Sequence, residues 1–289
     1  MPSRTPDYTM PGTLFVVATP IGNLEDVTMR ALRVLRDAHV VAAEDTRRTA
    51  KLLSHYGIQT PTLSFHAHNS RARLPQLLER LSRGDDVALV TDAGTPGISD
   101  PGVEFVAACR DRGIPVDPIP GASAALLAAV GSGFPLNSIT FLGFPPIKAK
   151  ARIEWFEALS RAAATLVFFE SPHRIASTLA DLRMYLGNRH ICVAREMTKA
   201  HQQFVIGRAD SDLFRAITIK GEFSVVVGPR EAESVSESHP GDHAILAAFL
   251  ALDRNGGGAG GRRQAISRVA KDLGLPANEV YRAIERAKI

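Results

Sequence analysis

The chain has 289 residues, of which 45% are hydrophobic and 22% charged, and its formal net charge is +4. This length and composition fit a globular chain with two modest domains and an extension, and the mild basicity permits a polyanionic partner without requiring one. Its apolar stretches fall short of the roughly 20 residues that a membrane helix needs, and the first ten residues lack the apolar core of a signal peptide. Two widely spaced cysteines, Cys109 and Cys192, predict neither a disulfide framework nor a zinc site, which favours a reducing cytoplasm.

Short apolar runs alternate with amphipathic segments through the first half of the chain. Asp26 or Thr28 suits the cap of the first amphipathic segment, and Gly57 and Gly84 suit the ends of the next two. This alternation of strands and helices indicates an α/β domain with a largely parallel sheet. The strands are expected at residues 13–19, 39–44, 86–92 and 114–121, and the helices at 29–38, 46–57, 72–84 and 103–113.

The second half also alternates, but it ends in three successive strands. The last two of these are expected to pair antiparallel, which would make this sheet mixed. A domain boundary is expected near Pro120 and Gly121, which gives an N-terminal α/β domain over residues 12–120 and a second over 121–230. Helices are expected at residues 122–130, 150–162 and 174–187, and strands at 138–144, 164–171, 190–196, 202–208 and 221–229.

The composition changes past Arg230. Residues 231–242 are polar and acidic and predict a linker, and the glycine-rich residues 255–261 predict a flexible hinge. Residues 243–252 predict a short apolar helix. Residues 262–289 predict two short helices around a Gly-containing turn, a pattern similar to helix-turn-helix geometry. This last segment carries seven Lys or Arg residues against three Asp or Glu. A small basic helical domain over residues 241–289 could contact nucleic acid, or it could dock or dimerise and leave its basic face in solvent.

Four loops follow predicted strands: "TPIGNLED", "DAGTPGISDPG", "PGASA" and "ESPHR". In open α/β sheets, ligands bind beyond the carboxyl ends of the strands. The second loop is long and rich in Gly and Pro, and its glycines would let a ligand such as an adenosine approach the backbone closely. It therefore favours a ligand-binding floor over a simple connection. The dinucleotide-binding, P-loop and G-x-S-x-G motifs do not occur in the sequence, which disfavours those enzyme classes.

Polar side chains near these loops are candidates for chemistry. His66 and His68 in "SFHAHNS" would point the same way in an extended segment, but no cysteine or third histidine nearby completes a metal site, so no metal is expected. Arg47 and Arg48 in "AEDTRRT" begin a helix, where they either bind a phosphate or remain solvated. Glu170 in "FFESPHR" begins a polar cluster directly after an apolar strand, which is typical of a residue that lines a site.

Taken together, these motifs resemble one family. The stretches "ATPIGNL", "AEDTRRT", "VTDAGTPGISDPG", "IPGASA", "FFESPHR", "REMTK" and "KGEFSVVVGP" occur in this order. The pattern is similar to that of the ribosomal RNA small-subunit methyltransferase I family, which belongs to the tetrapyrrole-methylase superfamily of S-adenosylmethionine enzymes. The resemblance covers about residues 12–230, and the "ATPIGNL" and "DAGTP" pair distinguishes this branch from the corrin methylases.

The resemblance implies two α/β domains with S-adenosylmethionine in the cleft between them, usually in a homodimer; the composition and the cysteine usage already favour a cytoplasmic protein that is not associated with a membrane. It implies 2′-O-methylation of a cytidine in the decoding region of 16S ribosomal RNA, so the partner is this RNA or the small ribosomal subunit. By motif position, it also implies a set of cofactor-binding residues. These are Pro20, Asp92, Ala93, Gly94, Pro96, Ile98, Ser123, Ala124, Phe169 and Glu170.

Methyl transfer from a sulfonium is an in-line displacement, so the enzyme mainly aligns the acceptor oxygen with the methyl group. A ribose 2′-hydroxyl is a weak nucleophile, and a base should help to remove its proton. The candidates for that role are Glu170, His68 with its neighbour His66, and Lys199, which would need a lowered pKa or would act by orienting another group. Arg47 and Arg48 near the predicted cleft, and Arg262 and Arg263 in the basic tail, are candidates for RNA phosphate contacts.

Two other functions remain as alternatives. A methyltransferase that acts on a small tetrapyrrole would need a closed, non-basic acceptor cavity and would have little use for the basic tail. A non-enzymatic nucleic-acid-binding protein would act through its C-terminal helices, and residues 241–289 alone would then reproduce the binding. The combination of loops disfavours the second alternative, and the basic tail disfavours the first.

Overall fold

The computed structural model describes residues 10–187, 189–230, 242–253, 261–273, 275 and 277–287. The chain divides into two compact units, Met1–Arg230 and Glu231–Ile289. The first nine residues and nearly all of the predicted linker and glycine-rich hinge lie outside the described residues. Within the described residues, no helix combines the length and apolarity needed to span a membrane.

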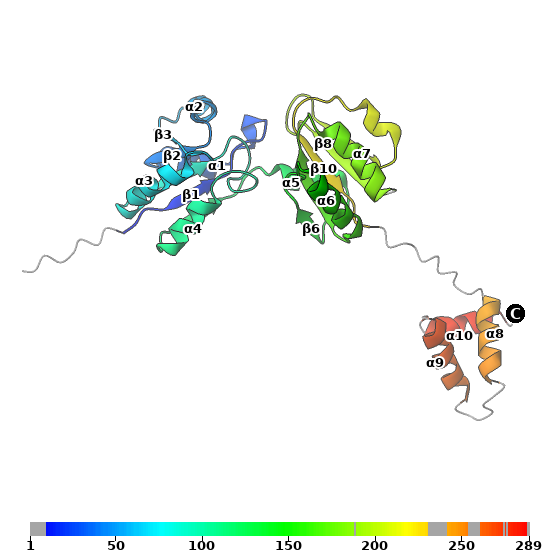
Figure 1. Cartoon of the computed structure of the whole chain (residues 1–289). Coiled ribbons are helices and arrows are strands. Elements are labelled where there is room, and N and C mark those ends of the chain that lie inside the picture. The colour runs from blue at the N-terminus through cyan, green and yellow to red at the C-terminus, as the bar shows by residue number, and fades with distance from the viewer. Residues whose placement is uncertain are drawn as a thin grey trace, which may run out of the picture. The chain divides into compact units, whose positions relative to one another are not determined.

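The first unit contains two five-stranded sheets (Figure 1). In the first sheet the strand order is β3-β2-β4-β1-β5, and each neighbouring pair is parallel, which confirms the predicted parallel sheet. Strands β2 and β4 are buried at every position because helices cover both faces of the sheet. The strands are β1 (Leu14–Val17), β2 (Val40–Ala43), β3 (Thr62–Ser64), β4 (Val87–Val90) and β5 (Val116–Ile119).

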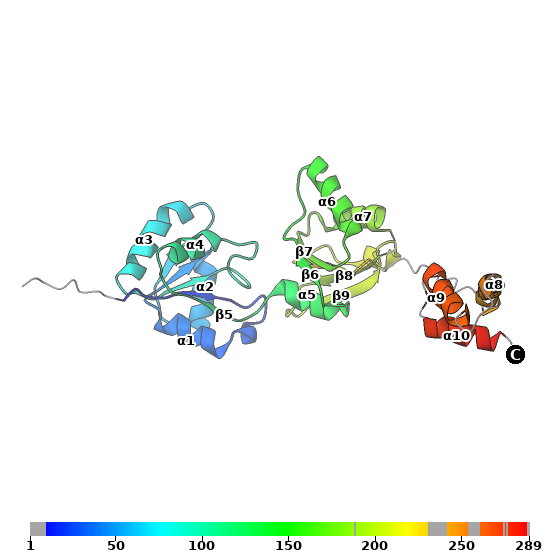
Figure 2. The ribbon, with the colours of Figure 1, turned by 90° about the horizontal axis from the view of Figure 1, so that it is seen from below.

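The helices of the first sheet pack on its two faces. Helices α3 (Ser70–Ser82) and α4 (Val103–Asp111) lie on one face, and α1 (Met29–Asp37) lies on the other (Figure 2). Helix α2 (Thr46–His55) shares the core cluster of α1 through Leu53. Each fully buried Leu or Phe side chain in these cores contributes about 1.5–3 kcal/mol to folding. As the sequence suggested, Thr28 caps α1, because its side chain accepts a hydrogen bond from the Ala31 backbone N–H.

The second sheet is mixed, as predicted, but its strand pairing differs from the prediction. The order is β6-β7-β10-β8-β9, so β8 lies between β9 and β10, which do not pair with each other. Strands β8 and β9 form an antiparallel pair joined by a short connection, and the fully buried β10 lies between β7 and β8. The strands are β6 (Ile139–Phe141), β7 (Thr165–Glu170), β8 (His190–Arg195), β9 (Gln203–Arg208) and β10 (Phe223–Val227).

Helices cover both faces of the second sheet (Figure 2). Helix α5 (Ala124–Ser132) lies on one face, where Ala125, Ala128 and Ala129 pack closely against the strands. Helices α6 (Ala149–Arg161) and α7 (Ile175–Leu186) cover the other face together with the short helix η2 (Asp212–Ala216). The two sheets therefore fall on either side of residues 120 and 121.

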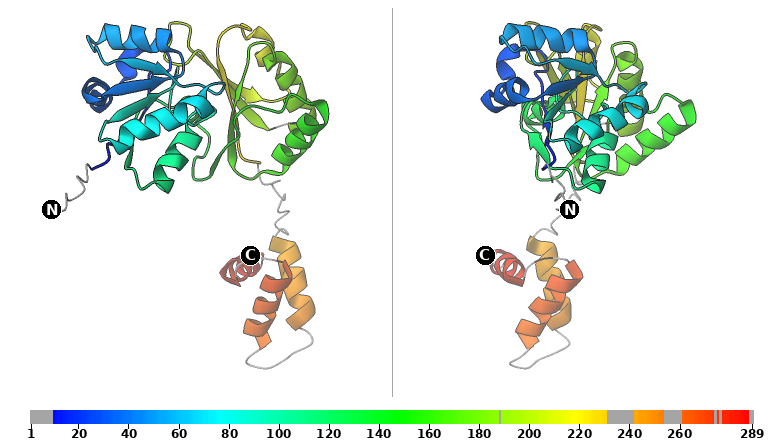
Figure 3. Two further views of the ribbon diagram at one scale, coloured as in Figure 1. Left: turned by 60° about the vertical axis from the view of Figure 1, so that its left-hand side comes forward. Right: turned by 90° about the vertical axis from the view of Figure 1, so that its left-hand side faces the viewer.

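In the second unit, the residues that the structure describes form helices α8 (Asp242–Asp253), α9 (Gly261–Leu273) and α10 (Ala277–Arg286) (Figure 3). Their apolar faces form one core around Phe249, Val269 and Ile284. The apolar helix α8 therefore belongs to the same small body as the two tail helices. A bidentate ion pair of Arg286 with Asp242, at 2.9 Å, fastens α10 to α8.

Candidate functional site

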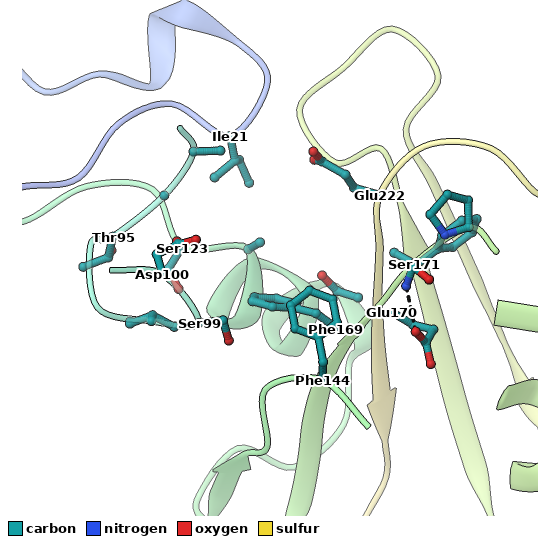
Figure 4. Close-up of a pocket in the computed structure, with 17 residues that line it drawn as sticks. Ile21, Thr95, Ser99, Asp100, Ser123, Phe144, Phe169, Glu170, Ser171 and Glu222 are labelled. Atoms are coloured by element: carbon teal, nitrogen blue, oxygen red, sulfur yellow. Dashed lines mark hydrogen bonds between the residues drawn. The ribbon is translucent and has the colours of Figure 1, made fainter. Parts of the chain in front are cut away.

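A cavity of about 360 Å³ lies between the carboxyl-end loop of β4 on one side and the ends of β7 and β10 on the other (Figure 4). The start of α5 closes one part of it. The structure thus brings together segments that are far apart in the sequence: loops that follow strands of both sheets, and the beginning of β10, which runs antiparallel to β7. The lining residues are Ile21, Ala93, Gly94, Thr95, Ile98, Ser99, Asp100, Ser123, Ala124, Phe144, Phe169, Glu170, Ser171, Pro172, Glu222, Phe223 and Ser224.

The long loop after β4 is ordered by its own backbone. Gly94 has φ +82°, a conformation that favours glycine, and it exchanges two hydrogen bonds of 2.9 and 3.0 Å with Thr19. These bonds fasten the loop to the segment after β1. Ser99, a pocket residue, adopts φ +65°, which is uncommon for a residue with a side chain. The turn-forming residues therefore hold the loop in one defined shape beside the cavity.

Asp100 places a carboxylate at the pocket. Burial, with the nearby charges of Glu44 and Asp92, raises the pKa of Asp100 to about 6. Glu44 is itself held in place, because its Oε2 atom accepts hydrogen bonds from the Thr91 hydroxyl at 2.6 Å and the Asp92 backbone N–H at 3.3 Å. This concentration of negative charge at the strand ends suits a cationic ligand.

Glu170 lines the cavity, but its carboxylate is directed away from it (Figure 4). Its side chain is 0% exposed; Oε1 accepts from Ser171 N and Arg174 Nε, each at 2.8 Å, and Oε2 accepts from the Thr178 hydroxyl at 2.6 Å. Because neighbouring residues of a strand point to opposite faces, Glu170 faces α7 whereas Phe169 faces the pocket side. This geometry argues against the predicted role of Glu170 as proton acceptor and gives its carboxylate the task of holding the loop that follows β7.

Lys199 does not have the lowered pKa that a general base would need. Its Nζ atom lies 2.8 Å from Glu196 Oε1 and 3.1 Å from Glu222 Oε2. Burial opposes the charge, but the hydrogen bonds and the negative charges of Glu196 and Glu222 together outweigh it and raise the pKa of Lys199. Lys199 is therefore an orienting residue for Glu222, which extends from the β10 side toward the space between the walls (Figure 4).

His68 lies beside the pocket rather than in its wall. It lines a neighbouring cavity of about 730 Å³ that shares Ser99 and Asp100 with the first. The His68 backbone N–H donates to His66 Nδ1 at 3.2 Å, so the two histidines are in contact. Among the described residues, no group of three or more His, Cys, Asp or Glu side chains is placed to hold a metal ion.

Three predicted cofactor residues lie outside the pocket lining. Pro20 and Asp92 line a separate depression of about 150 Å³ that also includes Arg48. Asp92 fastens the start of α2, because its Oδ1 accepts from the Asp45 backbone N–H at 3.0 Å and its Oδ2 lies 3.4 Å from Arg48. Pro96 is buried in the loop. The other seven predicted residues do line the pocket, namely Ala93, Gly94, Ile98, Ser123, Ala124, Phe169 and Glu170.

The predicted RNA-contacting arginines are all partly engaged within the protein where their side chains are described. Arg47 binds Asp45 through two hydrogen bonds, which hold the pKa of that carboxyl well below its usual range, yet its side chain is still 87% exposed. Arg262 pairs with Glu285 and lies 5.7 Å over the ring of Tyr281. The side chain of Arg263 lies outside the described residues.

Sequence reasoning missed several pocket residues. Asp100 stands in the quoted loop "DAGTPGISDPG", and its position beyond a parallel strand was a usable signal. Glu222 stands in the quoted stretch "KGEFSVVVGP", but its place in the cavity lining and its pairing with Lys199 become visible only in the folded structure. Phe144 follows β6 and gave no signal, because an isolated phenylalanine at a strand end is typical of a core.

The chain matches the family model described as Tetrapyrrole (Corrin/Porphyrin) Methylases over residues 13–211. It is 44% identical over 281 residues to the ribosomal RNA small subunit methyltransferase I of Halalkalibacterium halodurans, with 93% of each chain covered. A protein of the same name from Thermotoga maritima is 46% identical over 222 residues, which cover 76% of this chain and 100% of the relative.

Solved structures show the same fold at low sequence identity. The uroporphyrin-III-C-methyltransferase of Thermus thermophilus superposes with a TM-score of 0.55 at 23% identity, covering 75% of this chain and 94% of the other. A structure of that enzyme complexed with S-adenyl homocysteine gives a TM-score of 0.53 at 19% identity, covering 75% and 97%. From the family model and the close relatives, the chain belongs to the tetrapyrrole methylase family and, within it, to the ribosomal RNA small subunit methyltransferase I proteins.

Proposed function

We propose that the protein transfers a methyl group from S-adenosylmethionine to the ribose 2′-hydroxyl of a cytidine in the decoding region of 16S ribosomal RNA. The cavity between the two sheets, with an acidic wall and an aromatic wall, is the observation that carries this proposal. The names of the close relatives support ribosomal RNA of the small subunit as the acceptor. Methylation of bacterial ribosomal RNA supports a cytoplasmic location, which is part of the proposal.

The residues of the pocket fit the proposed cofactor. S-adenosylmethionine, when bound, supplies an activated methyl group on a positively charged sulfur, and it also carries an ammonium group. Asp100 offers an opposite charge, and Ser99 and Ser123 offer hydroxyl groups for polar contacts. Ile21 and Phe169 supply apolar surface of the kind that an adenine ring buries. Seven of the ten residues expected to bind the cofactor lie together in this lining.

The protein itself must align the acceptor hydroxyl with the methyl group and help to remove the proton of that hydroxyl. Three pocket residues carry carboxylates, but the carboxylate of Glu170 is buried and directed away from the cavity. Asp100 lies in the acidic cluster and is assigned to the cationic cofactor. Glu222, whose side chain is 70% exposed, is therefore assigned to accept the hydrogen bond of the acceptor hydroxyl, with Lys199 fixing its orientation.

The test is methyl transfer from labelled S-adenosylmethionine to small ribosomal subunits, naked 16S RNA and a tetrapyrrole precursor in parallel. The proposal expects label on one cytidine ribose of the RNA, and a kcat that falls about 100-fold in Glu222→Gln with an unchanged cofactor affinity. Label on the tetrapyrrole alone would overturn the substrate. A Glu222→Gln enzyme with wild-type kcat would overturn the assigned proton acceptor but leave the substrate standing.

A homodimer is part of the proposal. Leu126, Leu127 and Val130 form an exposed apolar face of α5, opposite the face that packs on the second sheet. The neighbouring strand β9 is an edge strand and exposes Ile206. Exposed apolar patches of this kind mark protein interfaces. Sedimentation should show a dimer that Leu126→Asp converts to a folded monomer, and a monomeric wild-type protein would contradict the proposal.

The second unit is proposed to bind RNA phosphates as an auxiliary domain over residues 241–289, beside α/β domains over 12–120 and 121–230. Arg268, Lys271 and Arg282 are exposed. These positions complement Arg262 and Arg263, which the sequence suggested. The family model ends at residue 211, before the second unit begins, and the relative from Thermotoga maritima aligns over its whole length with 76% of this chain. The unit is therefore expected to add affinity rather than to supply the chemistry.

A further inference from the structure

We propose that Phe144 is a stacking surface for a nucleobase of the RNA acceptor, and that the basic segment which follows it contacts the RNA backbone. This inference rests on the proposed function and adds a second point of contact at the same pocket. Phe144 lines the cavity, yet its side chain is 52% exposed. A half-exposed aromatic ring at the rim of a pocket offers flat apolar surface to a ligand.

The ring belongs to a cluster of three phenylalanines. Phe169 lies at its centre, with its ring centroid 5.0 Å from that of Phe141 and 5.7 Å from that of Phe144. Both contacts are edge-on, at interplanar angles of 63° and 61°, which is a favoured arrangement for aromatic pairs. Phe144 is thus supported by a ring that is partly buried in the core, and a large part of its surface stays available.

The backbone around Phe144 is fixed on both sides. The Gly143 carbonyl accepts a hydrogen bond from Phe169 N at 2.8 Å, and the Pro145 carbonyl accepts one from Arg174 Nη1 at 3.1 Å. Two consecutive prolines, Pro145 and Pro146, restrict the chain further. The ring is therefore held in place before any ligand arrives, so little conformational entropy would be lost when a base stacks on it.

Charge favours RNA as the occupant. The pocket itself contains the carboxylates of Asp100 and Glu222, which would repel phosphate groups. The segment directly after Phe144 carries two exposed lysines, Lys148 and Lys150, and its first acidic residue is Glu154. Aromatic platforms flanked by basic side chains are the usual way in which proteins bind unpaired nucleotides. A base at Phe144 would then let the phosphates run over the lysines, outside the acidic pocket.

The cofactor's adenine is the competing occupant of the ring, and variants distinguish the two. For Phe144→Ala we expect the KM for small ribosomal subunits to rise about tenfold, while the dissociation constant for S-adenosylmethionine stays unchanged. Phe144→Trp keeps an aromatic surface, so its KM for small ribosomal subunits should be close to that of the wild type. Ile147→Ala is the matched control, because Ile147 is 86% exposed and lies three residues away. Lys148→Gln should weaken the binding of RNA and lower the salt dependence of that binding by about one phosphate contact.

A binding assay separates this inference from the proposed function. A single-stranded RNA oligonucleotide of decoding-region sequence, labelled with 2-aminopurine, should lose fluorescence on binding to the wild type but not to Phe144→Ala, because stacking quenches the probe. Weaker binding of S-adenosylmethionine by Phe144→Ala would assign the ring to adenine and overturn the inference. Equal quenching by both proteins, or a change of oligomeric state in the variant, would also overturn it. A failure of the proposed function appears instead as a wild type that methylates no RNA.

Discussion

Protonation of Asp100 should control the affinity for S-adenosylmethionine. The pKa of Asp100 is raised to about 6 by burial and by the charges of Glu44 and Asp92. A cation in the pocket favours the ionised carboxylate, so the pKa must fall on binding, and the affinity must rise with pH until Asp100 is fully ionised. About nine-tenths of the carboxylate is ionised at pH 7 and about one-tenth at pH 5, so the affinity should fall about tenfold over that range.

Calorimetric titration of S-adenosylmethionine at several pH values measures this directly. Asp100→Asn should bind about 10- to 100-fold more weakly at pH 7, because a charge-assisted contact is lost, and its affinity should no longer follow pH through this range. Asp92→Asn is the matched control, because Asp92 belongs to the same acidic cluster but lines the neighbouring depression. A pH-independent affinity in the wild type, or equal losses in both variants, would refute the assignment of Asp100 to the cation.

Three further predictions concern two packing contacts in the first unit and the role of the second unit. Glu170→Ala should lower the free energy of unfolding by about 3–5 kcal/mol in chemical denaturation, because Arg152 and Arg174 lose a buried partner, whereas a loss below 1 kcal/mol would contradict a structural role. Gly131→Ala should destabilise the second sheet, since a Cβ atom there would lie 2.3 Å from the Phe204 ring, and an unchanged melting temperature would contradict this packing. Removal of residues 231–289 should leave kcat unchanged and flatten the salt dependence of RNA binding, and an unchanged salt slope would show that the second unit binds no phosphates.

Most of the framework was predictable from local patterns. The alternation of apolar runs and amphipathic segments placed the helices and most of the strands, because burial on a sheet or helix face imposes a period on the sequence. The order of strands in the second sheet was not predictable in this way. Periodicity shows that a strand is buried but not which strand lies beside it. The sequence pattern therefore did not indicate that β10 lies between β7 and β8.

The candidate site was predictable in part. The glycines and prolines of the loop after β4 identified one wall, because few residues other than glycine adopt the backbone angles seen at Gly94. The direction in which a side chain points depends on tertiary packing. The polar motif around Glu170 makes it a catalytic candidate from the sequence, but its hydrogen bonds to Arg174 and Thr178 direct its carboxylate away from the cavity. Glu222 is a candidate because the fold places it in the cavity lining and in contact with Lys199, which the sequence pattern does not show.

Photo-crosslinking of labelled S-adenosylmethionine, followed by peptide mapping, tests most directly whether this pocket holds the cofactor. Label is expected on peptides that contain residues 93–100 or 169–172, and it should be lost when unlabelled S-adenosylhomocysteine competes. Label confined to peptides that line the other depression, around Pro20 and Lys51, would place the cofactor outside the proposed pocket and contradict the account.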